Sequence, residues 1–268
     1  MTVPEVESHF VPGEALDVVL PASPEEAAAA FGDGKNVTVI GGGTILMPEI
    51  NAGRLRPKRA LLLGRAGLDK VEKGDTWHIG AAASVEALAD APEPLGSAAR
   101  AVGDLEVRSQ ATVGGNLCAG RGDEFPRGDL QVALVALGAR VRSTGKGGER
   151  TESVEEFLAG DRSSRLVLEV EVDLVGRRGA WAALDRPHAH SYTALSVAGA
   201  TTAEGGIRLA AGGTASHAVR LPSAESGKPE DALRDVELSD DALASAWYRA
   251  EMLPVLVGRV VSQLEAGA

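Results

Sequence analysis

The chain has 268 residues, 44% of them hydrophobic, so it is long enough to bury a sizeable core in two or three compact units. Its formal charge of -11 at pH 7 argues against nucleic acid or an anionic membrane surface as a partner. The single cysteine, Cys118, excludes an internal disulfide and cannot supply the thiolates of an iron–sulfur cluster, so any such cluster must lie on another chain.

The N-terminal segment carries acidic residues and prolines among its apolar residues, without a basic start and a continuous apolar run, so no signal peptide is expected. No stretch of the sequence approaches the roughly 20 apolar residues of a membrane span. A cytoplasmic location is therefore the expectation.

A first unit is predicted over residues 1–56. Ser23, Pro24 and Glu26 predict a helix start with a hydroxyl cap and a capping box, and the helix ends at Gly32. The branched residues 36–40 then favour a strand, which gives way to Gly41-Gly42-Gly43-Thr44. Three glycines can adopt positive φ and let backbone N–H groups approach an anion, and Thr44 adds a hydroxyl donor.

A second unit is predicted over residues 57–163. Strands are expected at 59–63, 76–82 and 139–143, and helices at 85–89, 95–102 and 129–137. Between them lies a second cluster, Thr112-Val113-Gly114-Gly115-Asn116, which brings together a hydroxyl, two glycines and a side-chain amide. Neither cluster matches G-x-G-x-x-G or a Walker loop, so a Rossmann or P-loop site is disfavoured. Together the clusters indicate a clamp for a dinucleotide diphosphate.

A third unit is predicted over residues 164–268. Alternating apolar residues from Leu166 to Val172 predict a strand with one buried face, and further strands are expected at 180–184, 193–203 and 207–211, with a hairpin turn at Gly205-Gly206. Residues 222–230 are expected to form an exposed loop. Two helices, 240–253 and 255–264, are predicted on either side of Pro254, the second packing a valine-rich stripe into the core of the chain.

With both glycine clusters in place, the chain resembles the FAD-binding medium subunit of the molybdenum hydroxylases, of the carbon monoxide and xanthine dehydrogenase type. In that family an A-G-G-x-S/T turn and a T-I-G-G-N turn hold FAD, and residues 41–45 and 112–116 stand at those positions. The resemblance covers nearly the whole chain. It implies an α+β fold with a two-part FAD-binding domain of the vanillyl-alcohol-oxidase/PCMH type, followed by a C-terminal domain with an antiparallel sheet and helices.

The resemblance also implies which residues contact the cofactor. An aspartate at the position of Asp129 bonds the sugar-like chain of FAD in the family, although Asp129 could also cap the helix that it opens. Tyr192 aligns with an aromatic residue near the isoalloxazine ring, and Arg186 is the nearest candidate for a basic residue of the family. The expected cofactor-binding residues are Gly41, Gly42, Gly43, Thr44, Ile45, Thr112, Val113, Gly114, Gly115, Asn116, Asp129, Leu168, Arg186 and Tyr192.

The function implied by the resemblance is electron transfer. A large subunit with the molybdenum cofactor oxidises the substrate, [2Fe-2S] clusters on a small subunit carry the electrons, and FAD on this chain passes them to an acceptor such as NAD, oxygen or a quinone. The protein positions and tunes the flavin, so no catalytic acid or base is expected. A hetero-oligomer is usual for the family.

Two alternatives stay open. The chain could be a self-sufficient FAD-dependent reductase of the enolpyruvyl-sugar reductase type, although no serine or glutamate is marked out as its proton donor. It could also be a cofactor-free assembly protein, against which the intact glycine clusters count. Cys118 is expected to be a small buried apolar residue, and His188 and His190 are expected to be surface residues rather than metal ligands, so no metal site is predicted in this chain.

Overall fold

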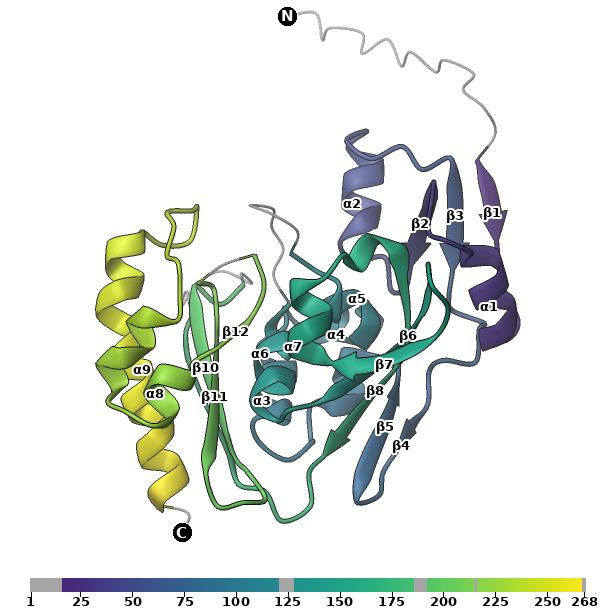
Figure 1. Ribbon diagram of the computed structural model, residues 1–268. Coiled ribbons are helices and arrows are strands. Elements are labelled where there is room, and N and C mark those ends of the chain that lie inside the picture. Colours follow the sequence, from purple (N-terminus) through teal and green to yellow (C-terminus); the bar gives the residue numbers. More distant parts are fainter. Residues whose placement is uncertain (1–15, 121–127, 186–191, 215, 267–268) are drawn as a thin grey trace, which may run out of the picture.

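The computed structural model describes residues 16–120, 128–185, 192–214 and 216–266, which form three sheets with their helices (Figure 1). The first sheet has three parallel strands in the order β1 (Asp17–Val19), β3 (Arg59–Leu62) and β2 (Val37–Ile40). Helix α1 (Pro24–Phe31) and helix α2 (Leu46–Asn51) connect these strands. As predicted, Ser23 caps α1 through its side chain, and the helix ends at Gly32.

The second sheet has five antiparallel strands in the order β4, β5, β8, β6, β7. One face of this sheet packs on helices and the other carries polar side chains, since Ile79, Val170 and Val172 are buried while Glu169 and Glu171 are partly exposed. The strands are β4 (Val71–Glu72), β5 (Thr76–Gly80), β6 (Arg140–Gly145), β7 (Arg150–Ser153) and β8 (Arg165–Asp173). The helical segments of this unit are η1 (Val85–Leu88), α3 (Leu95–Arg100), α4 (Leu105–Gln110), α5 (Val113–Leu117), α6 (Asp129–Ala136), α7 (Val154–Ala159) and η2 (Arg162–Ser164).

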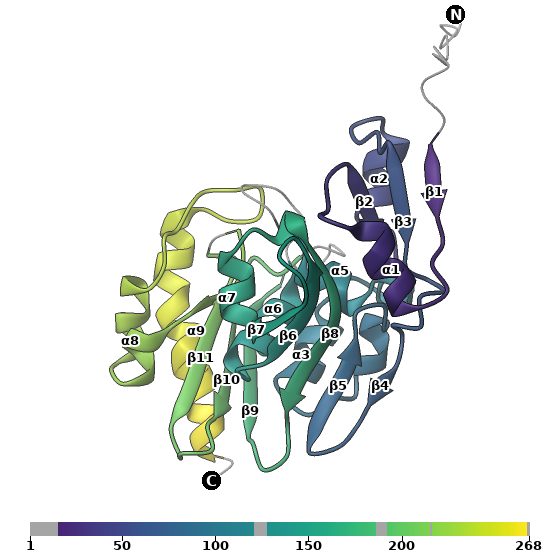
Figure 2. The same ribbon diagram turned by 45° about the vertical axis from the view of Figure 1, so that its right-hand side comes forward.

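The third sheet has four antiparallel strands in the order β12 (Val219–Arg220), β11 (Ile207–Gly212), β10 (Leu195–Thr201) and β9 (Gly179–Leu184). Helix α9 (Ala246–Ala266) covers one face, and α6 packs against the other (Figure 2). The short segments α8 (Pro222–Glu225) and η3 (Pro229–Arg234) lie beside α9 and β11.

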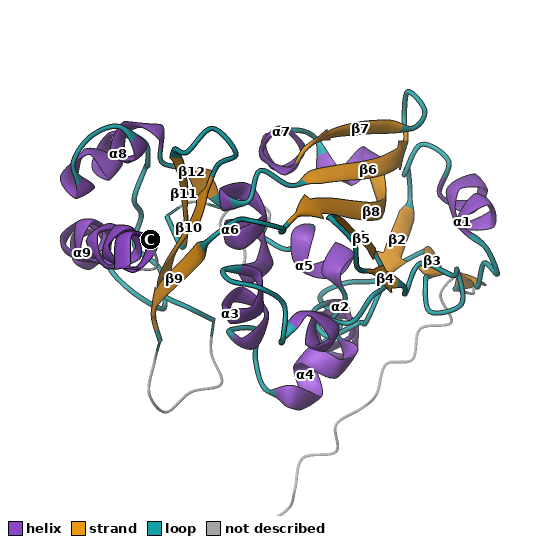
Figure 3. Ribbon diagram, turned by 90° about the horizontal axis from the view of Figure 1, so that it is seen from below, coloured by secondary structure: helices purple, strands orange, loops and turns teal. Residues whose placement is uncertain are grey.

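Helix α6 is the central element of the molecule. It lies between the five-stranded and the four-stranded sheets (Figure 3), and all eight of its residues are buried. A helix whose apolar residues face every side belongs in such an interior position. Because α6 joins the two sheets in one core, it fixes the position of residues at its N-terminal end, where Asp129 lies.

Three expectations about these elements are corrected by the structure. Strand β8 pairs with β5 and β6, so the strand expected to open the third unit at residue 164 belongs to the sheet of the second. Helix α9 is a single helix that contains Pro254, because buried residues on both sides of the proline, Leu253 and Leu256, pack in the same cluster. The expected loop at 222–230 contains α8 and the start of η3.

The stripe expected to pack inward on the C-terminal helix does so, since Val257, Val260 and Leu264 are buried against the four-stranded sheet. No helix in the described part of the chain is both long enough and apolar enough to cross a membrane.

Candidate functional site

A cleft of about 850 Å³ lies between the parallel three-stranded unit and the five-stranded unit. Both glycine clusters contribute to its walls, together with Tyr192. Sites for small molecules and cofactors in proteins are clefts of roughly this size. The cleft therefore brings together segments that are far apart in the sequence, as a dinucleotide clamp requires.

The first glycine cluster follows the carboxyl end of β2 and precedes α2. Within the described residues, the backbone N–H groups of Gly41 to Ile45 donate to no other protein group, and all five residues line the cleft. Consecutive backbone N–H groups of this kind form a cradle for an anion. Gly43, with a φ of 75°, is the one glycine of the three in the left-handed region.

Gly41 and Gly42 are required for a different reason than the positive φ expected from the sequence. A Cβ on Gly42 would overlap the carbonyl oxygen of Gln110, and a Cβ on Gly41 would overlap the Thr112 hydroxyl. These two glycines allow the first turn to touch the segment that leads into the second. The clamp is therefore held closed by backbone packing between its two halves.

The second glycine cluster has a different role from the first. The N–H groups of Val113 and Gly114 donate to the carbonyl oxygens of Ala83 and Ala81, at 2.9 and 2.8 Å, and the N–H of Gly115 donates to Thr112 Oγ1 at 3.2 Å. The backbone N–H groups of Val113, Gly114 and Gly115 are thus engaged within the protein. A ligand would instead meet the Thr112 hydroxyl and the side-chain amide nitrogen of Asn116, whose Oδ1 accepts from the N–H of Leu130 at 3.0 Å.

Asp129 lies near Tyr192, which lines the cleft. Asp129 is buried and accepts a hydrogen bond from the Thr193 hydroxyl at 2.6 Å. The helix cap is Gly128 rather than Asp129, which occupies the first helical position. Burial, and next to it the charge of Asp129, raises the pKa of the Tyr192 phenol, so the phenol stays protonated at neutral pH. Tyr192 is 37% exposed and lines the cleft.

Not every residue expected at the site lines the cleft. Leu168 packs in the hydrophobic cluster around Phe31 and Leu61, and Val113 is fully buried in the main core. Asp129 is also buried and is not among the residues that line the cleft. Arg186 lies outside the described residues, as do His188 and His190. Cys118 is partly buried against the core and also lines the cleft.

The cleft also contains charged residues that the sequence did not mark out. Arg54 donates to both carboxylate oxygens of Glu49 at 2.7 Å, which lowers the pKa of Glu49. Two buried arginines, Arg162 and Arg165, lie on the opposite wall. None of these residues belongs to a short motif, and each reaches the cleft through tertiary contacts, so only the folded chain reveals them.

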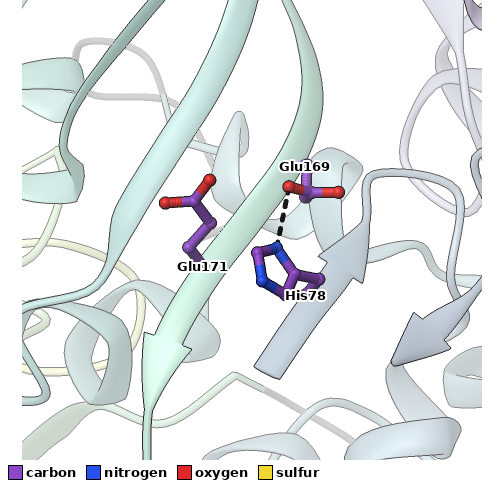
Figure 4. Close-up of side chains that lie close together, drawn as sticks. All are labelled: His78, Glu169 and Glu171. Carbon is purple, nitrogen blue, oxygen red and sulfur yellow. Dashed lines mark hydrogen bonds and ion pairs between the residues drawn. The ribbon is translucent and has the colours of Figure 1, made fainter. Parts of the chain in front are cut away.

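A separate group of possible metal ligands lies on the polar face of the five-stranded sheet (Figure 4). His78 of β5 and Glu169 and Glu171 of β8 place ligand atoms within 4.8 Å of one another. His78 Nδ1 lies 3.1 Å from Glu169 Oε1, and Arg142 of β6 lies 3.8 Å from Glu169 Oε2. Because the Arg142 guanidinium would compete with a cation for Glu169, the group is better explained as a row of paired charges across the strands.

Comparison with known proteins shows what the chain is similar to. Residues 14–172 match the family described as the FAD binding domain in molybdopterin dehydrogenase. The chain is 29% identical to caffeine dehydrogenase subunit beta of Pseudomonas sp. (strain CBB1) over 185 residues. This alignment covers 63% of this chain and 61% of that subunit. It is 25% identical over 271 residues to the glyceraldehyde dehydrogenase medium chain of Sulfolobus acidocaldarius, which covers 90% of this chain and 95% of the relative.

Solved structures show the same fold. Carbon monoxide dehydrogenase from Hydrogenophaga pseudoflava matches with a TM-score of 0.80 at 24% identity, over 94% of this chain and 97% of that chain. Quinoline 2-oxidoreductase from Pseudomonas putida 86 matches with a TM-score of 0.79 at 20% identity, over 95% of this chain and 98% of that chain. These findings confirm the expected resemblance and the expected fold class.

Proposed function

The chain belongs to the family of FAD-binding domains of molybdopterin dehydrogenases, and from this premise we propose that it is the electron-transfer subunit of a molybdenum-containing hydroxylase or dehydrogenase. In this role the chain receives electrons from iron–sulfur clusters of a partner and passes them through FAD to an external acceptor. The relatives named above are dehydrogenase subunits or chains, which supports an oxidoreductase subunit.

The observation that carries this proposal is the first glycine turn. Its backbone N–H groups, from Gly41 to Ile45, line the cleft and donate to no other group in the residues the structure describes. A diphosphate needs such donors, and fixed backbone dipoles supply them whatever the net charge of the chain. The residues present therefore fit a dinucleotide such as FAD.

The other residues of the cleft would bind and orient the rest of the cofactor. Thr44 and Thr112 supply hydroxyl donors, and the amide nitrogen of Asn116 adds a donor at the second turn. Asp129 is buried and does not itself line the cleft, but it neighbours Tyr192, and we propose it as a carboxylate acceptor for a hydroxyl of the cofactor. Tyr192 lines the cleft with an uncharged, protonated phenol. When bound, FAD supplies the redox chemistry, and these side chains hold it in place.

The partners follow from what this chain lacks. One cysteine in these 268 residues cannot hold a [2Fe-2S] cluster, so an iron–sulfur electron donor must lie outside them. We propose a small iron–sulfur subunit and a large molybdenum-cofactor subunit, with NAD, oxygen or a quinone as the acceptor class. The substrate pocket would then belong to the large subunit.

The test is flavin content. The purified chain should show the flavin absorption bands, and heat release followed by chromatography should yield FAD in near-equal ratio to protein. Apoprotein should bind FAD far more tightly than FMN, since FMN lacks the diphosphate and adenosine that the first turn would hold. A protein that binds no flavin, even when reconstituted together with the two partner subunits, would overturn the proposal.

A further inference from the structure

Arg162 is a buried cation in the wall of the cleft, at the start of η2 between α7 and β8. It is 7% exposed. Its Nη1 donates to the carbonyl oxygen of Ala119 at 3.2 Å, and its Nη2 donates to the carbonyl oxygen of Gly120 at 2.5 Å. Both carbonyls belong to the segment that leaves α5, and Ala119 and Gly120 themselves line the cleft.

The contact depends on an unusual backbone conformation. Successive carbonyl groups of an extended chain point in opposite directions, so one planar guanidinium cannot reach both. Gly120 has a φ of 70°, in the left-handed region that glycine adopts without strain, so the chain is not extended where Arg162 binds both carbonyls. Arg162 and Gly120 therefore act as a pair.

A second buried side chain works on the same segment. Gln131 of α6, which is 1% exposed, donates from Nε2 to the carbonyl oxygens of Leu117 at 3.0 Å and Ala119 at 2.9 Å. Its Oε1 accepts from the N–H of Ala218 at 3.2 Å. The carbonyl groups after α5 are thus bonded to the protein interior from two sides.

We propose that Arg162 is a positioning residue for the cofactor. By binding the Ala119 and Gly120 carbonyls, it holds their oxygens toward itself and away from the ligand. It also places a buried positive charge in the cleft wall. This inference rests on the proposed FAD function. A cation favours an anionic ligand on this side of the cleft, because the N–H groups of Val113, Gly114 and Gly115 are engaged within the protein. The chain as a whole also carries a charge of -11, which would repel such a ligand.

The experiment compares FAD dissociation constants and flavin redox potentials of the wild type with those of Arg162→Met and Arg162→Lys, each purified as the full chain. Arg162→Met should weaken FAD binding at least tenfold and shift the flavin potential to more negative values, because reduced flavin is anionic and loses a nearby cation. Arg162→Lys keeps the charge without the two-pronged fork. It should retain the potential of the wild type while binding FAD more weakly.

Arg249→Met is the matched control. Arg249 is also a buried arginine that donates to backbone carbonyls, among them Ala194, but it lies in the third unit, away from the cleft lining. Its loss should lower the melting temperature without changing the potential of bound flavin. If Arg162→Met binds FAD with unchanged affinity and potential, the inference is wrong. If the wild type binds no FAD, the proposed function itself fails.

Discussion

The backbone of Gly42 lies so close to the carbonyl oxygen of Gln110 that a β-carbon at Gly42 would overlap it. This contact joins the turn after β2 to the end of α4, just before α5. The two halves of the cleft therefore have a fixed separation, set by the absence of one side chain.

Gly42→Ala should force the two turns apart and abolish FAD binding. Overpacking of a close contact costs about 1–3 kcal/mol, so the apoprotein should also unfold at a lower urea concentration. Flavin-to-protein absorbance ratio and urea unfolding measure the two effects. Gly64→Ala is the control, because Gly64 is exposed and a Cβ there meets no atom within 4 Å. Normal FAD binding by Gly42→Ala would contradict a closed clamp.

Thr112 caps α5 and faces the cleft, so its hydroxyl can be tested by two substitutions. Thr112→Val removes the group that accepts from the N–H of Gly115 and should cost about 1 kcal/mol in the free energy of unfolding. Thr112→Ser keeps the hydroxyl and should retain both stability and FAD affinity. Equal behaviour of the two variants in chemical unfolding and FAD titration would mean that the hydroxyl is dispensable.

The features predictable from the sequence depend on near neighbours in the chain. The cap at Ser23 and the helix after it follow from four consecutive residues, and the valine stripe ending at Leu264 follows from helical spacing. The two glycine clusters are recognisable because each is a short, unusual run. Local patterns of this kind can be interpreted without knowledge of contacts with the rest of the chain.

The features that the sequence did not reveal are set by contacts between distant segments. Strand β8 has an ordinary alternating pattern, and its own sequence does not indicate that it pairs with β5 and β6. The hydrogen bonding of the second turn is equally unpredictable from the sequence, because its N–H groups donate to the carbonyls of Ala81 and Ala83, some thirty residues earlier. Arg162 reaches Gly120 across 42 residues.

Pro254 gives a prediction about stability alone. A proline inside a helix removes a backbone hydrogen bond and costs about 3 kcal/mol relative to alanine. Because α9 continues through Pro254, Pro254→Ala should raise the free energy of unfolding by about 1–3 kcal/mol and leave FAD binding unchanged. Val255→Ala, at a neighbouring position that is 44% exposed, should have little effect. A lower stability for Pro254→Ala would show that the surrounding contacts require the proline.

Ionisation of Tyr192 should lower the free energy of unfolding at alkaline pH. Its pKa is raised in the folded protein, by burial and then by Asp129, above the value of about 10 for an unfolded tyrosine. Above that pH the unfolded chain loses the phenolic proton first, so the folded state becomes less stable as pH rises. Tyr192→Phe should lose less stability over this range. Tyr248→Phe leaves Tyr192 as the only phenol, so ultraviolet titration of that variant reads its pKa directly.

Asp129→Asn tests the effects of Asp129 on Thr193 and on Tyr192 at once. An asparagine keeps an oxygen that can accept from the Thr193 hydroxyl, so the fold should be retained, but the negative charge is lost. The Tyr192 phenol should then titrate at a lower pH than in the wild type, while remaining above its ordinary value because burial, the larger cause, persists.

The same variant should weaken FAD binding by about 1–3 kcal/mol if the carboxylate accepts a hydrogen bond from the cofactor, since hydrogen bonds to charged groups lie in that range. Thr193→Val is the control, because it removes the hydroxyl partner of Asp129 and leaves the charge. A loss of affinity in Asp129→Asn that Thr193→Val does not reproduce assigns the effect to the carboxylate. Equal losses in both variants would instead mean that Asp129 acts only by holding Thr193 and the start of β10 in place.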